Sequence, residues 1–292
     1  MRAQDVARLI CLAALWGGSF AFIRVAVPAL GPIWLAECRV ALAFAALFAV
    51  ALVRRDLPPF AAHWRTYVAV GTINSALPFA LFSFAELFIS ASNAAILNAT
   101  SPFFGAIVAA SWLREPLGAR RLTGMALGLA GVVLLVGWQA DPLSATVMVA
   151  ALACLAAALC YGVASVCAKV RMAGIPSFAV AIYSQLGAAI VLAPALPFVP
   201  PPGALTPLVA ANVLALALAS TAIAYLLYFR LIADVGPARA LTVTFLIPLF
   251  GVLWGVLFLG ERVAIGMLSG CALILAGTWL ALRTTRPAPR TA

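Results

Sequence analysis

Charged residues are scarce in this sequence. Asp, Glu, Lys and Arg together make up 9% of the 292 residues, and there is a single histidine, whereas about 25% charged residues is typical of soluble chains. The chain is 66% apolar with a mean hydropathy of +1.15, which leaves too few polar side chains to cover a soluble surface. These values exclude a soluble enzyme, a disordered chain and a disulfide-rich secreted module. The continuous apolar blocks exclude a β-barrel, whose strands alternate.

Motifs for catalysis are also missing. The sequence has no P-loop, H-E-x-x-H or G-x-S-x-G pattern, and one histidine cannot build the usual zinc or Ser–His sites. The six cysteines lie in apolar blocks without a C-x-x-C pair, which favours small buried hydrophobic residues over a disulfide or zinc framework. We therefore expect neither an enzyme nor a bound metal or cofactor.

Long apolar blocks dominate the chain and predict an all-α polytopic membrane protein. One span needs about 20 apolar residues. Breaks that are polar or carry Pro and Gly divide the chain into ten predicted spans, at 7–27, 32–53, 66–88, 92–113, 119–138, 146–168, 176–198, 206–230, 238–259 and 263–283. Two groups of five spans give predicted units at 1–140 and 141–283, followed by a tail at 284–292.

The net charge of +10 is spread unevenly over the predicted loops. With ten spans, fifteen of the 18 basic residues fall on the same side as the N-terminus. They are Arg2, Arg8, Arg54, Arg55, Arg65, Arg114, Arg120, Arg121, Lys169, Arg171, Arg230, Arg239, Arg283, Arg286 and Arg290. Because basic residues accumulate in cytoplasmic loops, we expect both termini in the cytoplasm and no nucleic-acid partner.

Self-comparison reveals an internal repeat, in which residues 98–131 match residues 244–277 without a gap. The paired positions include Pro102 and Pro248, Gly105 and Gly251, Gly124 and Gly270, Gly131 and Gly277, and, from the first span of each copy, Trp16-Gly17 and Tyr161-Gly162. Each copy holds five predicted spans, an odd number, so the second copy must be inverted in the membrane. Inverted repeats recur in secondary transporters, with the substrate site near the midplane between the halves.

The repeat resembles the EamA family of the drug/metabolite transporter superfamily over about residues 5–283. The resemblance rests on Trp16-Gly17-Gly18-Ser19-Phe20, the block around Pro102, and the paired stretches Leu113-Arg114-Glu115-Pro116 and Leu259-Gly260-Glu261-Arg262. Within the family, the chain is most similar to bacterial exporters of aromatic and other neutral amino acids. The resemblance implies ten helices around a central cavity in the bacterial cytoplasmic membrane, and export by alternating access without ATP.

Polar and aromatic residues inside the spans form the predicted site, because such groups in a membrane face a cavity or another helix. Proline frees a backbone carbonyl that can bind a ligand and also provides a bend. Hydroxyl and amide groups suit an ammonium and a carboxylate, and aromatic rings offer stacking or cation–π contact. Helix packing is the competing interpretation. The candidate substrate-binding residues are Trp16, Asn74, Ser75, Pro78, Asn98, Ser101, Pro102, Tyr161, Thr221, Tyr225, Thr244 and Pro248.

Arg24, Glu37, Arg39 and Glu86 are the charges deepest in the spans. They suggest either a proton-coupling or substrate-charge role, or a salt-bridge cluster or snorkelling that stabilises packing; we favour the structural role. The first span also lacks the acidic residue that small multidrug pumps of the superfamily carry there. Two further acidic residues, Glu115 and Glu261, are expected to satisfy amides at the N-termini of the fifth and tenth helices.

The motifs Gly124-x-x-x-Gly128 and Gly266-x-x-x-Gly270 allow close helix packing. We expect them to join the two repeats within a monomer. The expected partners are the lipid bilayer and a small-molecule substrate, with amino acids as the first choice. Another metabolite, a drug or a lipid-linked sugar stays open as the substrate, as do the direction of transport and coupling to protons.

Overall fold

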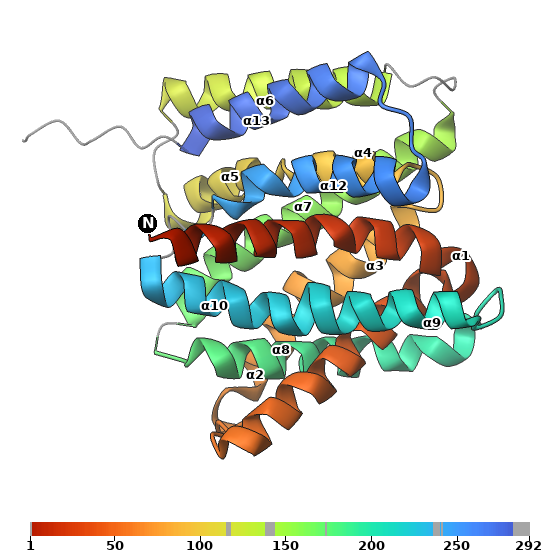
Figure 1. The fold of residues 1–292 in the computed structure, drawn as a ribbon. Coiled ribbons are helices and arrows are strands. Elements are labelled where there is room, and N and C mark those ends of the chain that lie inside the picture. The colour runs from red at the N-terminus through yellow and green to blue at the C-terminus, as the bar shows by residue number, and fades with distance from the viewer. Residues whose placement is uncertain are drawn as a thin grey trace, which may run out of the picture.

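The computed structural model describes residues 2–114, 118–137, 144–172, 174–235, 240 and 242–282. Every regular element in these ranges is a helix, which confirms the all-α prediction. The helices run roughly alongside one another in a layered bundle, with most of their ends on two opposite sides (Figure 1). Among the described residues, seven helical segments are long and apolar enough to cross a membrane, and two shorter apolar helices follow them.

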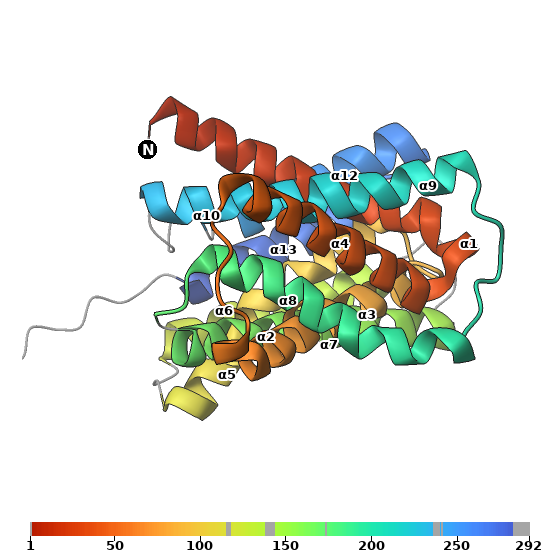
Figure 2. The ribbon, with the colours of Figure 1, turned by 90° about the horizontal axis from the view of Figure 1, so that it is seen from below.

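Helix α1 (Ala3–Arg54) contains two of the predicted spans. At 52 residues and 1.5 Å per residue it is about 78 Å long, far more than the hydrocarbon thickness of about 30 Å. Gly31 divides it into two legs because its backbone is not helical (φ 73°, ψ 166°). Pro28 and Pro32 flank this break, and each removes one backbone donor. The second leg runs between α9 and α8 (Figure 2).

The remaining elements follow the predicted spans closely. They are η1 (Ala61–His63), α2 (Trp64–Gly71), η2 (Thr72–Ala76), α3 (Leu77–Ala85), α4 (Ala91–Asn98), α5 (Ser101–Leu113), α6 (Ala119–Gly137), α7 (Ala145–Arg171), α8 (Ser177–Leu192), η3 (Ala193–Phe198), α9 (Pro207–Leu214), η4 (Ala215–Ile223), α10 (Ala224–Val235), α12 (Val243–Leu259) and α13 (Ile265–Leu282). Several predicted spans are therefore composite, with α2, η2 and α3 in one and α9, η4 and α10 in another.

Apolar side chains also cover much of the surface. Leu129 and Val133 on α6 are 62% and 65% exposed, and Phe258 on α12 is 72% exposed. Helices α6 and α13 form an outer layer of the bundle (Figure 1). Such a surface is unfavourable in water but suits the hydrocarbon core of a bilayer.

Glycines at repeat-related positions make close helix contacts, and they do so reciprocally. A Cβ on Gly17 of α1 would lie 2.8 Å from the backbone nitrogen of Gly251 on α12. Its counterpart Gly162 on α7 lies against Gly105 on α5, where a Cβ would be 2.7 Å from the backbone nitrogen. Each first-span glycine thus packs on the proline-containing span of the other copy.

The glycines of α6 and α13 follow the same rule. A Cβ on Gly124 would lie 2.6 Å from the carbonyl oxygen of Gly277, and one on Gly131 would lie 2.8 Å from that of Gly270. The predicted use of glycine for contacts between the two copies is therefore observed at Gly124 and Gly270. Gly128 takes part as well, since a Cβ on Gly277 would lie 2.6 Å from its backbone nitrogen, and it also accommodates the ring of Phe103.

Candidate functional site

Two π-helical segments interrupt the third and eighth predicted spans. The first, η2, contains Asn74 and Ser75, and the second, η4, contains Thr221. In η2 the Leu77 amide donates to the carbonyl of Thr72, five residues back. π-Helical turns are rare and often occur at functional sites. The predicted polar residues of both spans therefore lie in locally widened backbone.

Three hydrogen bonds join these segments to neighbouring helices, and each bond crosses between the two halves of the chain. Asn74 Nδ2 donates to Tyr225 Oη over 3.1 Å, and Arg39 Nε donates to Thr221 Oγ1 over 2.9 Å. Gln185 Nε2 of α8 donates to Ser75 Oγ over 3.1 Å. We call these six residues the polar layer. Four of them, Asn74, Ser75, Thr221 and Tyr225, were predicted as substrate-binding residues, and the structure brings them together.

Arg39 is the charged residue of the polar layer and is 6% exposed. It lies eight residues beyond Gly31 on the second leg of α1, about 12 Å along the helix. Its Cζ atom is 3.6 Å from the centroid of the Phe79 ring on α3, a cation–π contact. Pro78, another predicted residue, is buried in the first turn of α3 beside this ring.

Gln185 was missed by the sequence analysis. It is fully buried, and its Oε1 atom has no hydrogen-bond partner in the described part of the chain. The available signal was an amide in the middle of the otherwise apolar span 176–198. A polar residue at such a depth is costly, which makes its position informative.

The break between α4 and α5 shows what happens to the carbonyls that Pro102 frees. The Ser101 hydroxyl donates to the Asn98 carbonyl over 2.6 Å, and the Thr278 hydroxyl donates to the Ala99 carbonyl over 3.1 Å. The predicted ligand acceptors are thus already satisfied by the protein in this conformation. Asn98, Ser101 and Pro102 are each half-buried.

The equivalent proline in the second copy does not interrupt its helix. Pro248 lies inside α12 and is buried, and Thr244 is half-buried one turn before it. The two proline spans therefore differ in shape, one broken into α4 and α5 and the other continuous.

The pseudo-equivalent aromatic residues Trp16 and Tyr161 both border the largest apolar cluster. Trp16 lies 5.3 Å from Tyr228, measured between ring centroids, and Tyr161 stacks on Phe82 at 6.2 Å. Both are half-buried. They are not in contact with each other through any ring pair in the described residues.

The expected salt-bridge cluster does not form. Arg24, Glu37, Arg39 and Glu86 all lie within the described ranges, and none is within ion-pair distance of another. The Arg24 guanidinium donates instead to the backbone carbonyl of Glu86. The Glu86 carboxyl is fully buried with neither oxygen hydrogen-bonded, and Glu37 Oε2 is also unpartnered.

Glu261 satisfies helix amides, but not those of its own helix. Its carboxylate accepts from the backbone nitrogens of Ala91 and Ser92 at 2.8 and 3.1 Å and from the Ser92 hydroxyl. These groups form the N-terminus of α4. Glu261 therefore caps α4, and the expectation that it caps the tenth helix is wrong. Sequence spacing favoured the adjacent helix, whereas the fold brings α4 closer. The expectation for Glu115 falls outside the described residues.

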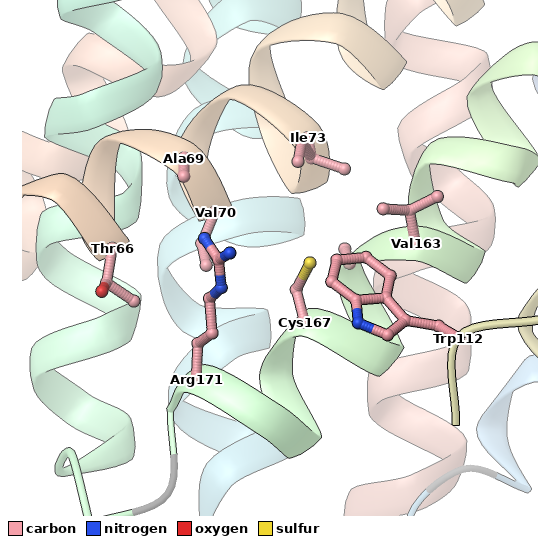
Figure 3. A pocket seen from close by; sticks show the side chains of 9 residues that line it. Thr66, Ala69, Val70, Ile73, Trp112, Val163, Cys167 and Arg171 are labelled. Atoms are coloured by element: carbon pink, nitrogen blue, oxygen red, sulfur yellow. The ribbon is translucent and has the colours of Figure 1, made fainter. Parts of the chain in front are cut away.

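Two cavities are found among the described residues, and none of the six residues of the polar layer lines either of them. One of about 220 Å³ is bordered by α2, η2, α5 and α7, with Arg171 and Trp112 on either side of Cys167 (Figure 3). The other, of about 460 Å³, lies between the second leg of α1 and α9. No predicted substrate-binding residue lines either of them.

The described part of the chain is an all-helical, lipid-compatible bundle whose two halves meet at a polar layer. The EamA-like transporter family matches this chain twice, over residues 6–137 and 148–283. The chain belongs to this family and is a polytopic membrane transporter, not an enzyme. The family resemblance expected from the sequence is confirmed.

Individual relatives are distant but nearly full in length. The chain is 21% identical to the uncharacterized transporter YoaV of Bacillus subtilis, over 93% of this chain and 94% of that protein. It is 27% identical to a probable terminal-alkyne amino-acid exporter of Streptantibioticus cattleyicolor, over 97% and 95%. One solved crystal structure with 21% identity superposes with a TM-score of 0.66 over 97% of each chain, so the fold is shared.

Proposed function

We propose that this transporter exports small amphipathic metabolites, most readily aromatic and other neutral amino acids, by alternating access without ATP. The observation that carries the proposal is the polar layer, in which η2 and η4 bring amide, hydroxyl and guanidinium groups together between apolar helices. An amino acid carries both charges and an apolar side chain, so it needs such groups beside aromatic surface. The amino-acid exporter among the relatives supports the same substrate class.

The proposal includes ten spans in two inverted repeats, at 1–140 and 141–283, with the 284–292 tail in the cytoplasm. The break at Gly31 supports counting α1 as two spans. The reciprocal packing of Gly17 on Gly251 and of Gly162 on Gly105 is what a two-fold relation between the copies produces. The basic loops support cytoplasmic termini in the bacterial inner membrane, and a monomer suffices because one chain carries both copies.

Within this scheme the predicted residues have distinct roles. Asn74, Ser75, Thr221 and Tyr225 supply hydrogen bonds to the substrate, with Pro78 shaping the turn beside them. Trp16 and Tyr161 supply aromatic surface from the two halves. The remaining predicted residues, which lie on the two proline spans, line the pathway or permit bending there: Asn98, Ser101, Pro102, Thr244 and Pro248.

The test is flux in liposomes containing the purified chain. Labelled phenylalanine should enter saturably, and unlabelled neutral amino acids should compete. The same assay with an imposed pH gradient separates proton coupling from facilitated diffusion. Absence of saturable flux for every neutral amino acid would overturn the substrate proposal and leave the fold and family untouched.

A further inference from the structure

We propose that Arg39 is the anion anchor of the transport site, and that the substrates are recognised through a carboxylate. This inference rests on the proposed function and sharpens it. It makes the carboxylate, rather than the ammonium or the side chain, the group for which the site is selective. The argument depends on the burial of Arg39, its unused donors and its surroundings.

The positive charge of Arg39 lacks a counter-ion. The side chain is 6% exposed, and no carboxylate in the described part of the chain lies within 4.0 Å of it. Arginine is never neutral at ordinary pH, so its positive charge needs a negatively charged partner inside the membrane. An unpaired buried charge is strongly unfavourable, and a bound anion removes that cost.

The donors needed to hold an anion are free. A guanidinium has five N–H groups, and among the described residues Arg39 uses one hydrogen bond, from Nε to Thr221. The guanidinium carbon lies 3.6 Å from the centroid of the Phe79 ring, which limits its movement, and the guanidinium itself is planar and rigid. The terminal nitrogens therefore keep a fixed fork, which is the geometry that binds a carboxylate with two parallel hydrogen bonds.

The neighbours of Arg39 suit the rest of an amino acid. Tyr225 on α10 lies one turn after Thr221, the hydrogen-bond partner of Arg39, and Tyr161 on α7 packs against the apolar cluster that contains Phe79. These two tyrosines offer ring surface and hydroxyls on the other half of the molecule. Glu86 accepts no hydrogen bond on its carboxyl oxygens, so it does not occupy the fork. The site thus combines one strong anion donor with aromatic surface.

The experiment compares three ligands that share one ring. The purified chain in nanodiscs is titrated with L-phenylalanine, with L-phenylalaninamide, which lacks the carboxylate, and with 3-phenylpropionate, which lacks the ammonium. The amide should bind about 10- to 100-fold more weakly than phenylalanine, the loss expected for a charge-assisted hydrogen bond to a carboxylate. 3-Phenylpropionate should bind measurably. Equal affinity for phenylalanine and its amide would overturn the proposal without any variant.

Substitutions then assign the effect to Arg39. Arg39→Met should bring phenylalanine down to the affinity of the amide, and Arg39→Lys should keep a reduced preference for the carboxylate because the charge stays but the fork is lost. Arg171→Met, which removes a positive charge beside the cavity of Figure 3, should leave the preference unchanged. If Arg39→Met keeps the full preference for phenylalanine, Arg39 is not the anchor.

The outcomes also separate this proposal from the proposed function. Phenylalanine flux without discrimination against the amide keeps amino-acid transport and overturns the anchor. Binding of 3-phenylpropionate without flux of any amino acid keeps the carboxylate site and overturns the amino-acid substrate. Failure of both carboxylates to bind overturns the anchor whatever the flux assay gives.

Discussion

At the scale of single residues, buried Glu86 and half-buried Glu261 differ in their hydrogen bonds. Glu86 has no partner for either carboxyl oxygen, whereas Glu261 accepts three hydrogen bonds at the N-terminus of α4. Glu261→Gln should therefore destabilise the fold by about 1–3 kcal/mol, because it removes charge-assisted hydrogen bonds. Glu86→Gln should leave stability unchanged or raise it, since the carboxyl oxygens of Glu86 have no hydrogen bond to lose.

Thermal unfolding followed by tryptophan fluorescence measures both variants. The informative quantity is the difference between them, because both carry the same change from acid to amide. Similar losses in the two midpoints would mean that Glu86 holds a partner in solution. Flux under a pH gradient then shows whether Glu86 also takes part in transport.

The bond between Asn74 and Tyr225 leads to a second prediction. Tyr225→Phe removes the acceptor that joins η2 to α10. We expect the KM for phenylalanine to rise by about 2- to 10-fold, the worth of one neutral hydrogen bond. Tyr183→Phe is the matched control, because its hydroxyl donates to the Pro58 carbonyl over 2.6 Å, outside the polar layer. That control should affect stability but not KM; equal effects on KM would remove Tyr225 from the site.

At the scale of helices, glycine contacts set how closely the two halves approach. A Cβ on Gly17 would lie 2.6 Å from Phe250 Cβ, whereas one on Gly18 would first meet Trp254 at 3.4 Å. Gly17→Ala should destabilise by about 1–3 kcal/mol through overpacking, and Gly18→Ala should be tolerated because 3.4 Å is an ordinary contact. The two variants make the same substitution at adjacent positions of α1. The difference between their unfolding midpoints therefore measures the contact of Gly17 with α12.

Much of this helical arrangement could be predicted from the sequence. The apolar blocks and the Pro–Gly breaks identify the elements, and the paired glycines indicate where the halves touch. The π-helical segments could not be predicted, because TINSA and ALALASTAI differ little in composition from an α-helix. The helix that Glu261 caps could not be predicted either, because its hydrogen-bond partner lies 170 residues away in the sequence. Gln185 was recognised as part of the site only through its hydrogen bond to Ser75.

The site was predictable in type but not in arrangement. Intramembrane polarity identified Asn74, Thr221 and Tyr225, because polar groups are costly in lipid. The same rule grouped Arg39 with the acids as a salt-bridge cluster, since opposite charges at similar depths are expected to pair. Helix rotation decides which side chains meet, and it directs Arg39 to Thr221 instead. Rotation depends on packing across the whole bundle and cannot be inferred from one span.

At the scale of the whole molecule, alternating access requires contacts that close one end and open again. On the side that holds the N-terminus, Asp234 at the end of α10 accepts from Arg8 of α1 at 2.6 Å and from Arg230 at 3.0 Å. Leu12, Leu231 and Val243 pack fully buried just inside this ion pair. The ion pair joins the first span to the eighth and lies between these three apolar side chains and the end of the bundle.

Asp234→Asn should open this end more often, because a neutral amide weakens both ion pairs. The reporter is Leu12→Cys in a variant that lacks the six native cysteines. The rate at which this cysteine reacts with a membrane-impermeant thiol reagent measures how often the end opens. That rate should rise in Asp234→Asn and in Arg8→Gln. It should stay unchanged in Asp56→Asn, which removes an acid on the loop after α1. An unchanged rate at position 12 in both variants would show that the ion pair does not control this end.

The pH dependence of the same reaction provides an independent check. Hydrogen bonding from Arg230, together with the positive charges of Arg230 and Arg8, holds the pKa of Asp234 below its ordinary value of 3.8. A lowered pKa means that closure by the ionised carboxylate is complete above the ordinary value and is lost as pH falls through the lowered one. Only the thiolate reacts, and its fraction rises with pH, so the rate at position 12 is divided at each pH by the rate in a matched Leu57→Cys variant, whose site is exposed. This ratio should be flat between about pH 5 and 8 and increase only in stronger acid. A change of the ratio within the neutral range would assign control of this end to a different titrating group, because Asp234 stays ionised throughout it.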